Sequence, residues 1–232
     1  MKKLLFLTAI ISIGMVSCKK KGCTDPTAAN YNMEAEKDDE SCVYIPTIIV
    51  TGSSTMTINI GDTYTDGGAT ATNKDGSAVN VASDISQVNT STVGTFIITY
   101  TATNEHGTAT ATRTVNVVIG QSNWLGTPSV SDDCNIALFP VSGSPTITAG
   151  ATTSDINIDP MFTVAGGTVT ATIDGSTITV PQQTIDITVG DIILSGTGTM
   201  NVNGTQFTID YTYDNTTPII GGSGSCTVTY SL

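Results

Sequence analysis

The chain is poor in charge and in histidine, and each shortage excludes a class of site. Charged residues make up 12% of its 232 residues, roughly half the ~25% of an average domain. The one histidine, His106, lies among turn-forming residues, and we interpret it as a solvated turn residue. Without a second histidine, the C-terminal half is not expected to hold a zinc-hydrolase centre or a Ser–His–Asp triad.

Positive charge and helical periodicity are equally scarce. The formal net charge is −12, which repels phosphate backbones, so nucleic acid is not an expected partner. Apolar residues almost nowhere recur at the spacing of a helix face. Thr, Val, Ile and Tyr are abundant instead, and these residues suit a half-buried pleated surface. The composition therefore predicts an all-β protein.

The chain also lacks a recognisable catalytic motif. Neither a G-x-G-x-x-G sequence nor a phosphate-binding loop opens a helix. A glycoside hydrolase needs only two carboxylates, and the C-terminal half offers many, but nothing singles out a pair. We interpret them as solvated strand ends and expect no enzymatic activity. These carboxylates are Asp132, Asp133, Asp155, Asp159, Asp174, Asp186, Asp191, Asp210 and Asp214.

The first 18 residues are organised as an export signal. Lys2 and Lys3 form a basic head, Leu4–Val16 form an apolar run, and Ser17 precedes Cys18. The run is shorter than the ~20 residues that a membrane-spanning helix needs. Its ending resembles the bacterial lipoprotein signal. This resemblance implies that residues 1–17 are removed and that Cys18 is acylated, which anchors the protein in the cell envelope, at the outer membrane. The alternative is an ordinary secretory signal with an incidental cysteine.

Four further cysteines are expected to form disulfides, because an exported protein keeps them oxidised. Sequence alone permits three pairings. We favour Cys23–Cys42 and Cys134–Cys226, because each pair then brackets one compositional unit. A four-cysteine zinc site is the rival interpretation, but it needs close C-x-x-C spacing, which the chain lacks.

Residues 18–45 are predicted to be a linker that carries a small acidic module. The segment 22–44 resembles a cysteine-bracketed module of exported Bacteroidetes proteins, CTDPxAxNYNPxAxxDDGSCxY, and departs from it at Met33 (usually Pro) and Glu40 (usually Gly). So short a segment cannot bury a core, so a disulfide must hold it. Its oxygen ligands suit calcium, although the spacing of a calcium-binding loop is missing; we favour a solvated acidic cap. The candidate calcium ligands are Asp25, Asp38, Asp39 and Glu40, near Asn30 and Asn32.

Residues 46–119 are predicted to form the first domain. Apolar residues alternate at 48–50, 56–60, 69–71, 79–81, 96–102 and 109–117, which predicts about seven short strands in a β-sandwich. The sequences at 60–69, 93–104 and 112–117 resemble the bacterial immunoglobulin-like domain of surface proteins and some crystal pesticidal proteins. The resemblance implies a spacer or docking module. Arg113 falls on the same face of its predicted strand as the alternating apolar residues. This position predicts a β-bulge near it or a side chain bent outward.

Residues 120–128 are rich in turn formers and are predicted to link this domain to a second one. They contain Trp124, the only tryptophan. One interpretation is a platform that stacks on a sugar. The other, more common for a tryptophan at a junction, is that it packs one domain on the next.

Residues 129–232 are predicted to form a second antiparallel domain, a β-barrel or a β-sandwich. Asp174-Gly175 and Asn203-Gly204 are strong hairpin signals. Further strands are predicted at 136–141, 183–188, 192–195 and 225–231, with an edge or bulge at Pro181. The segment resembles the β-domains of unknown function that follow immunoglobulin-like domains in Bacteroidetes lipoproteins. Alternation places one set of residues on a single face: Met200, Val202, Phe207, Ile209, Tyr211 and Tyr213.

Three functions are open at this point. The first is a surface-anchored, non-catalytic protein that binds a glycan or a cell-envelope protein through its C-terminal domain. The second is a structural or adhesive spacer, and the third, which we favour least, is a glycoside hydrolase. Apart from calcium no cofactor is expected, the lipid makes the membrane a partner, and the sequence does not predict the ligand-binding residues.

Overall fold

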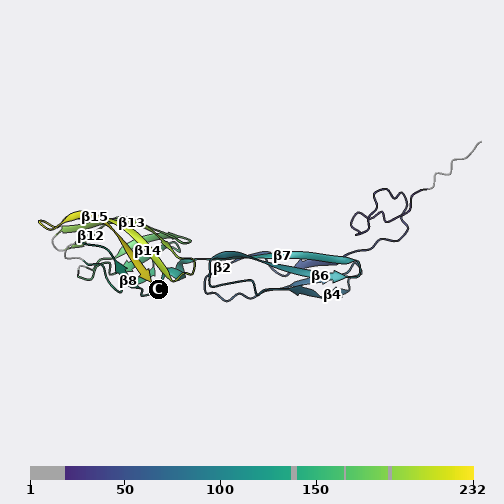
Figure 1. Cartoon of the computed structure of the whole chain (residues 1–232), viewed down its shortest axis with the longest axis horizontal. Helices are drawn as coiled ribbons and strands as arrows, with labels where there is room; N and C mark the ends of the chain where they lie inside the picture. Colours follow the sequence, from purple (N-terminus) through teal and green to yellow (C-terminus); the bar gives the residue numbers. More distant parts are fainter. Residues whose placement is uncertain (1–18, 137–139, 165, 188–189) are drawn as a thin grey trace, which may run out of the picture. The chain divides into compact units, whose positions relative to one another are not determined.

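The computed structural model describes residues 19–136, 140–164, 166–187 and 190–232 (Figure 1). The predicted signal segment and Cys18 lie outside the described residues. The fold is built almost entirely from strands, as the composition predicts. In the part of the chain that the structure describes, no helix is both long and apolar enough to cross a membrane. The chain divides into two compact units, one of residues 1–49, 69–82 and 101–110 and the other of residues 50–68, 83–100 and 111–232.

Seven strands occupy residues 47–118, the number that the alternation of apolar residues predicts. One sheet has the order β1-β3-β4, and the other has the order β2-β7-β6-β5. The two-residue turn Glu105–His106 joins the longest pair of strands. The strands are β1 (Thr47–Val50), β2 (Thr55–Asn59), β3 (Ala69–Thr72), β4 (Ala78–Val79), β5 (Val81–Ser83), β6 (Gly94–Asn104) and β7 (Gly107–Val118).

Strand β2 pairs in parallel with the end of β7, with Thr55 opposite Thr114 and Asn59 opposite Val118. The pairing proceeds one residue at a time without a register shift. On β6 and β7 the apolar side chains alternate with exposed polar ones, so one face of the pair is buried. Those buried residues are Ile98, Tyr100, Ala102, Val115 and Val117.

Arg113 does not behave as predicted. Its side chain is neither bent outward nor solvated: only 2% of it is exposed. The guanidinium instead donates hydrogen bonds to the backbone carbonyls of Thr51 and Gly68, which flank β1 and β3. The prediction of an outward side chain was wrong because a buried carboxylate, Asp66, lies 3.1 Å from Nη1 and supplies the charge that an inward-facing arginine requires.

Residues 129–231 supply one eight-stranded antiparallel sheet that curves into a half-barrel, in the order β8-β15-β14-β13-β12-β11-β10-β9 (Figure 1). Its two edges approach each other, because Gly126 bridges Ile147 of β9 and the Val130 amide donates to the Gly143 carbonyl. The 3-10 helix η1 (Gln121–Trp124) precedes it. The strands are β8 (Ser129–Asp132), β9 (Thr146–Ala149), β10 (Asp155–Asp159), β11 (Val169–Asp174), β12 (Thr177–Ile187), β13 (Gly190–Met200), β14 (Gln206–Asn215) and β15 (Gly222–Ser231).

Both predicted hairpins form, but their turns differ from the predicted ones. Asp174 pairs with Thr177, so the first turn is Gly175-Ser176. Met200 pairs with Phe207, and the second connection is longer than the predicted two residues. The predicted irregularity at Pro181 is a register shift between Val180 and Gln183, within one long β12. The prediction that Val202 joins the buried face was wrong: β13 ends at Met200, and Val202 is 64% exposed in the turn. The predicted strand at 136–141 lies partly outside the described residues.

The core of the half-barrel lies on the inner face of the sheet and includes Trp124. The indole is fully buried, and its ring centroid lies 5.0 Å from that of Phe207, which in turn stacks on Tyr230 at 4.5 Å. The sugar-platform interpretation of Trp124 is therefore wrong, because no ligand can reach a fully buried ring. The tryptophan is a packing residue of the C-terminal core.

Candidate functional site

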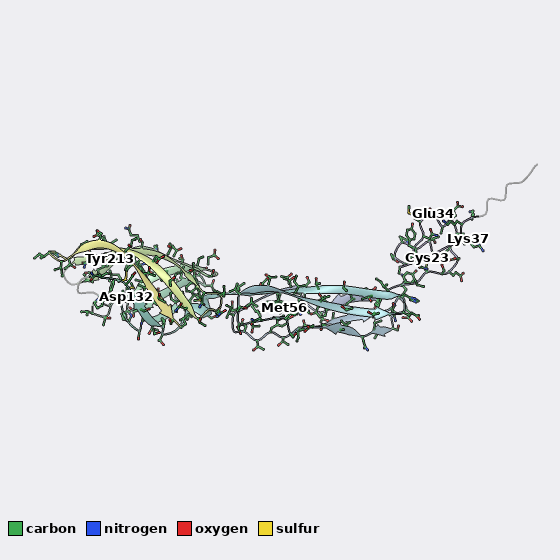
Figure 2. The ribbon with its side chains drawn as sticks, in the orientation of Figure 1. Cys23, Glu34, Lys37, Met56, Asp132 and Tyr213 are labelled. Carbon is green, nitrogen blue, oxygen red and sulfur yellow. A yellow bond between two sulfur atoms is a disulfide. The ribbon has the colours of Figure 1, made fainter. Side chains whose placement is uncertain are left out.

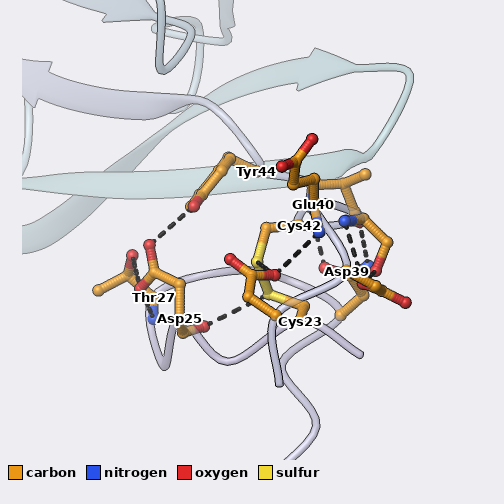
Figure 3. The surroundings of a disulfide bond; sticks show 11 residues. Cys23, Asp25, Thr27, Asp39, Glu40, Cys42 and Tyr44 are labelled. Carbon is orange, nitrogen blue, oxygen red and sulfur yellow. Dashed lines mark hydrogen bonds between the residues drawn. A yellow bond between two sulfur atoms is a disulfide. The ribbon is translucent and has the colours of Figure 1, made fainter. Parts of the chain in front are cut away.

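The acidic module is held by a disulfide and by side chains that cap its own turns (Figure 3). Cys23 and Cys42 are bonded, as the favoured pairing predicts. Asp25 accepts hydrogen bonds from the backbone amide of Thr27 at 2.9 Å and from the Tyr44 hydroxyl at 2.7 Å. These bonds, the Thr27 amide first, lower the pKa of Asp25 to about 2. The carboxylate thus ties the start of the module to its end.

The remaining acidic residues of the module serve separate turns. Asp38 accepts the amide of Glu40 at 3.0 Å, and Asp39 accepts the amide of Ser41 at 3.1 Å. The Ser41 hydroxyl also donates to Asp39 and is the main reason that the pKa of this carboxyl is lowered. Glu40 has a φ of 64°, in the left-handed region. Glycine, which stands at this position in the sequence pattern that the segment resembles, adopts this conformation without steric penalty.

The four candidate calcium ligands are not gathered into one group. Among the described residues, one set of three or more potential ligands has all its donor atoms within 4.8 Å of one another, and that set is Asp133, Cys134 and Cys226. Its two sulfur atoms are joined in a disulfide, as the favoured pairing predicts, so they are not thiolate ligands. Calcium at Asp25, Asp38, Asp39 and Glu40 stays a prediction.

A hollow of about 250 Å³ beside the module lies between Tyr44, Lys74 and the turn at Glu105–His106. Several groups around it already have partners. The Lys74 ammonium lies 4.6 Å from the centre of the Tyr44 ring, and Asn104 donates to the Tyr44 carbonyl and to Asn73. The Asn104 side-chain oxygen also accepts the amides that follow it at the turn. Asn104 therefore joins the end of the module to the neighbouring turns, a role that the sequence did not predict.

Several hollows lie on the half-barrel, and two of them bear on ligand binding. One, of about 410 Å³, lies on the outer face of the sheet between threonines of β12, β13 and β14, beside Asp210. The other, of about 150 Å³, lies at the end of the half-barrel where β14 turns into β15. It is close to the Cys134–Cys226 disulfide, and the half-exposed Tyr213 that lines it is labelled in Figure 2.

Hydrogen bonds lower the pKa of several carboxyls outside the half-barrel. A glycoside hydrolase keeps one carboxyl protonated by raising its pKa. In the described chain, each carboxyl whose pKa departs clearly from its ordinary value is shifted downward by hydrogen bonds that outweigh desolvation. These carboxyls belong to Asp25, Asp39, Asp66, Asp75 and Asp84, and none of them lies in the half-barrel.

Residues 48–117 match the family model described as "Bacterial surface protein, Ig-like domain". This segment is an immunoglobulin-like domain. It takes in β1 to β7, the buried Arg113 and the turn at Glu105–His106. A solved structure of a lipoprotein from Bacteroides thetaiotaomicron is similar to this chain at 13% identity, over 81% of this chain and 100% of that one, with a TM-score of 0.30. No curated protein matches the chain.

Proposed function

We propose that this chain is a lipoprotein of the bacterial outer membrane that binds a glycan or a protein partner and catalyses no reaction. The match of residues 48–117 to a domain named for bacterial surface proteins carries this proposal. Acylation of Cys18 would provide the anchor, and the basic residues that follow it would lie at the lipid surface. The immunoglobulin-like domain would then act as a spacer, and the half-barrel as the binding domain.

The net charge bears on the class of ligand. An acidic chain of net charge −12 disfavours anionic ligands. Hollows lie on the half-barrel at its rim and on its outer face, and loop-borne or rim-borne sites are common in domains of this kind. A neutral glycan fits these features better than a charged polymer.

A glycan array tests the proposal. The full chain, purified in detergent, is applied to printed neutral and acidic glycans, with calcium and with chelator. Saturable binding to a subset of glycans is the expected result. Proximity labelling on intact cells forms the second arm, because a protein partner would give a blank array and a specific labelled neighbour. If neither arm gives a specific partner, the binding proposal is wrong and a pure spacer replaces it.

Localisation is tested separately. A Cys18→Ser variant should lose metabolic labelling with a palmitate analogue and should leave the membrane fraction. A variant that stays acylated or stays in the outer membrane would contradict the assignment of the anchor to Cys18.

A further inference from the structure

Among the described residues, those that line the hollow at the end of the half-barrel carry no charge, in a chain of net charge −12. One of its glycines is required by close packing, since a Cβ on Gly221 would lie 2.1 Å from the Asn215 carbonyl oxygen. Its volume of about 150 Å³ suits a single small ring. The side chains that line it are Asn135, Ile136, Tyr213, Asn215, Ile220 and Ser223.

Asn215 breaks the pattern of its strand. Along β14 the inward positions are apolar or aromatic, ending in the buried Tyr211 and the half-buried Tyr213. Asn215 is the next inward position and is only 4% exposed. A carboxamide at an inward strand position is expensive to bury unless its polar atoms are paired. A polar residue at a buried strand position is expected where a function requires it.

Half of this carboxamide lacks a partner. The Asn215 side-chain oxygen accepts hydrogen bonds from the backbone amide and the hydroxyl of Thr217. Among the described residues, none accepts a hydrogen bond from Asn215 Nδ2. The orientation is fixed, because the Thr217 amide can only donate and so must face the oxygen. Asn215 lines the hollow, but its Nδ2 atom has almost no accessible surface, so a ligand acceptor reaches this buried donor only if the side chains around it shift.

The turn above the hollow is held in an unfavourable conformation. Ile219 has a φ of 76°, which is a genuine outlier for a β-branched residue. The Gly221 amide donates to the Thr217 carbonyl at 2.8 Å, and Thr216 is tied to the backbone of Asp191 on β13. These bonds hold Ile220, 39% exposed, at the mouth of the hollow.

We propose that this hollow binds one neutral sugar ring of a glycan, a proposal that rests on the binding function above. Asn215 Nδ2 donates to a ring or hydroxyl oxygen. Ile136, Ile220 and the Tyr213 ring cover the C–H faces of the sugar. The Asn135 carboxamide and the Ser223 hydroxyl are exposed at the rim. The Ser223 hydroxyl donates to Asp214, so its oxygen accepts from an outer hydroxyl of the sugar, and the Asn135 carboxamide completes the remaining hydrogen bonds. The absence of lysine and arginine from the described lining selects against acidic sugars.

The experiment titrates the full chain in detergent with four neutral probes and one acidic probe. The neutral probes are the methyl glycosides of glucose, galactose, mannose and N-acetylglucosamine, and the acidic probe is sialic acid methyl glycoside. The readouts are calorimetry and the NMR resonance of the Asn215 side-chain amide. We expect at least one neutral glycoside to bind and to shift that resonance, and the acidic probe to bind at least tenfold more weakly.

Two variants with matched controls locate the site. Asn215→Asp keeps the oxygen that Thr217 requires and removes the donor, and Asn157→Asp adds the same charge on β10. Ile220→Ala trims the exposed wall, and Val202→Ala trims an exposed residue of another turn. We expect Asn215→Asp and Ile220→Ala each to weaken binding about tenfold or more and the controls to leave it unchanged. If Asn215→Asp does not fold, the effect of Ile220→Ala on glycoside binding tests the site by itself.

The outcomes separate the two proposals. Glycan binding on the array that survives both site variants overturns this assignment and leaves the binding function standing. Failure of all four neutral glycosides, or preference for the acidic probe, also overturns the assignment. Absence of any partner on the array and in cells overturns the proposed function itself.

Discussion

The Arg113 guanidinium lies 3.1 Å from the Asp66 carboxylate, with 2% and 9% of the two side chains exposed. The same Asp66 oxygen accepts the hydroxyl of Tyr100 at 2.5 Å and that of Tyr64 at 3.0 Å. Burial raises the pKa of Asp66, but hydrogen bonds from Tyr100 and Tyr64, together with Arg113, lower it by more. One carboxylate therefore satisfies three buried donors of the immunoglobulin-like domain.

Asp66→Asn is expected to destabilise this domain by about 3 kcal/mol, because it leaves the buried charge of Arg113 without a counter-ion. Urea unfolding measures the change. The double variant Asp66→Asn, Arg113→Met should lose less than the sum of the single variants, since the uncompensated charge is gone. Additive losses would show that the two side chains do not act as a pair.

Glu40→Gly is expected to stabilise the acidic module by about 1 kcal/mol, because glycine adopts a positive φ without the penalty of a Cβ. Hydrogen exchange of the Asn32 amide, which donates to the Cys23 carbonyl, measures the local effect. Asp38→Gly is the control, since it removes the acceptor of the Glu40 amide and should increase exchange. Faster exchange in Glu40→Gly would contradict the argument.

The half-barrel should lose stability in alkali because of Tyr211 and Tyr230, whose hydroxyls lie 3.2 Å apart. Burial raises the pKa of Tyr230 to about 12 and that of Tyr211 well above its ordinary value. Tyrosines of the unfolded chain ionise near pH ~10. The stabilisation is thus complete below pH ~10 and is lost as the pH rises toward ~12. In urea unfolding, Tyr230→Phe should reduce the fall of the free energy of unfolding with rising pH. An unchanged dependence on pH would contradict the prediction.

Calcium removal should leave the thermal midpoint of the module unchanged, because its carboxylates serve separate turns. Calorimetry with calcium and with chelator checks this. Reduction of the Cys23–Cys42 bond is the positive control and should abolish the module transition, since a segment this short buries little core. A calcium-dependent rise in the midpoint would restore the ion site.

Ile219→Gly should raise the thermal midpoint and weaken glycoside binding together. Glycine removes the strain at a φ of 76°, worth about 1 kcal/mol, and frees the turn that holds Ile220. Tighter binding in this variant would contradict a role of the turn in fixing the wall of the hollow.

The fold was largely predictable because period-two alternation and turn chemistry act locally. The strands of the immunoglobulin-like domain and the hairpins at Asp174-Gly175 and Asn203-Gly204 follow from residues that are neighbours in sequence. Strands β8, β9 and β10 were not predicted, because they are short and carry polar residues such as Asn157 beside their apolar ones. The length of β12 was not predicted, because a proline usually interrupts a strand. Here a register shift accommodates Pro181 within the strand.

The candidate site could not be predicted, because it depends on contacts between distant segments. Nothing local marks Asn215 as buried or as half-paired; its burial follows from the alternation of β14 and its pairing from Thr217. The partner of Arg113 lies 47 residues away in sequence at Asp66. The rule that alternate residues of a strand share one face predicts apolar residues at buried positions. It cannot predict a buried arginine that is paired with a distant carboxylate.

The parallel pairing of β2 with β7 has a mechanical consequence. After β1, the chain runs into β2, and it leaves the immunoglobulin-like domain after β7, so a pull on the two ends of the segment from β2 to β7 acts on these strands along their length in opposite directions. The paired residues, from Thr55–Thr114 to Asn59–Val118, then bear the load together, whereas peeling would break the pairs one at a time. Under the proposed function, this pairing would suit the domain to carry a pulling force along its strands.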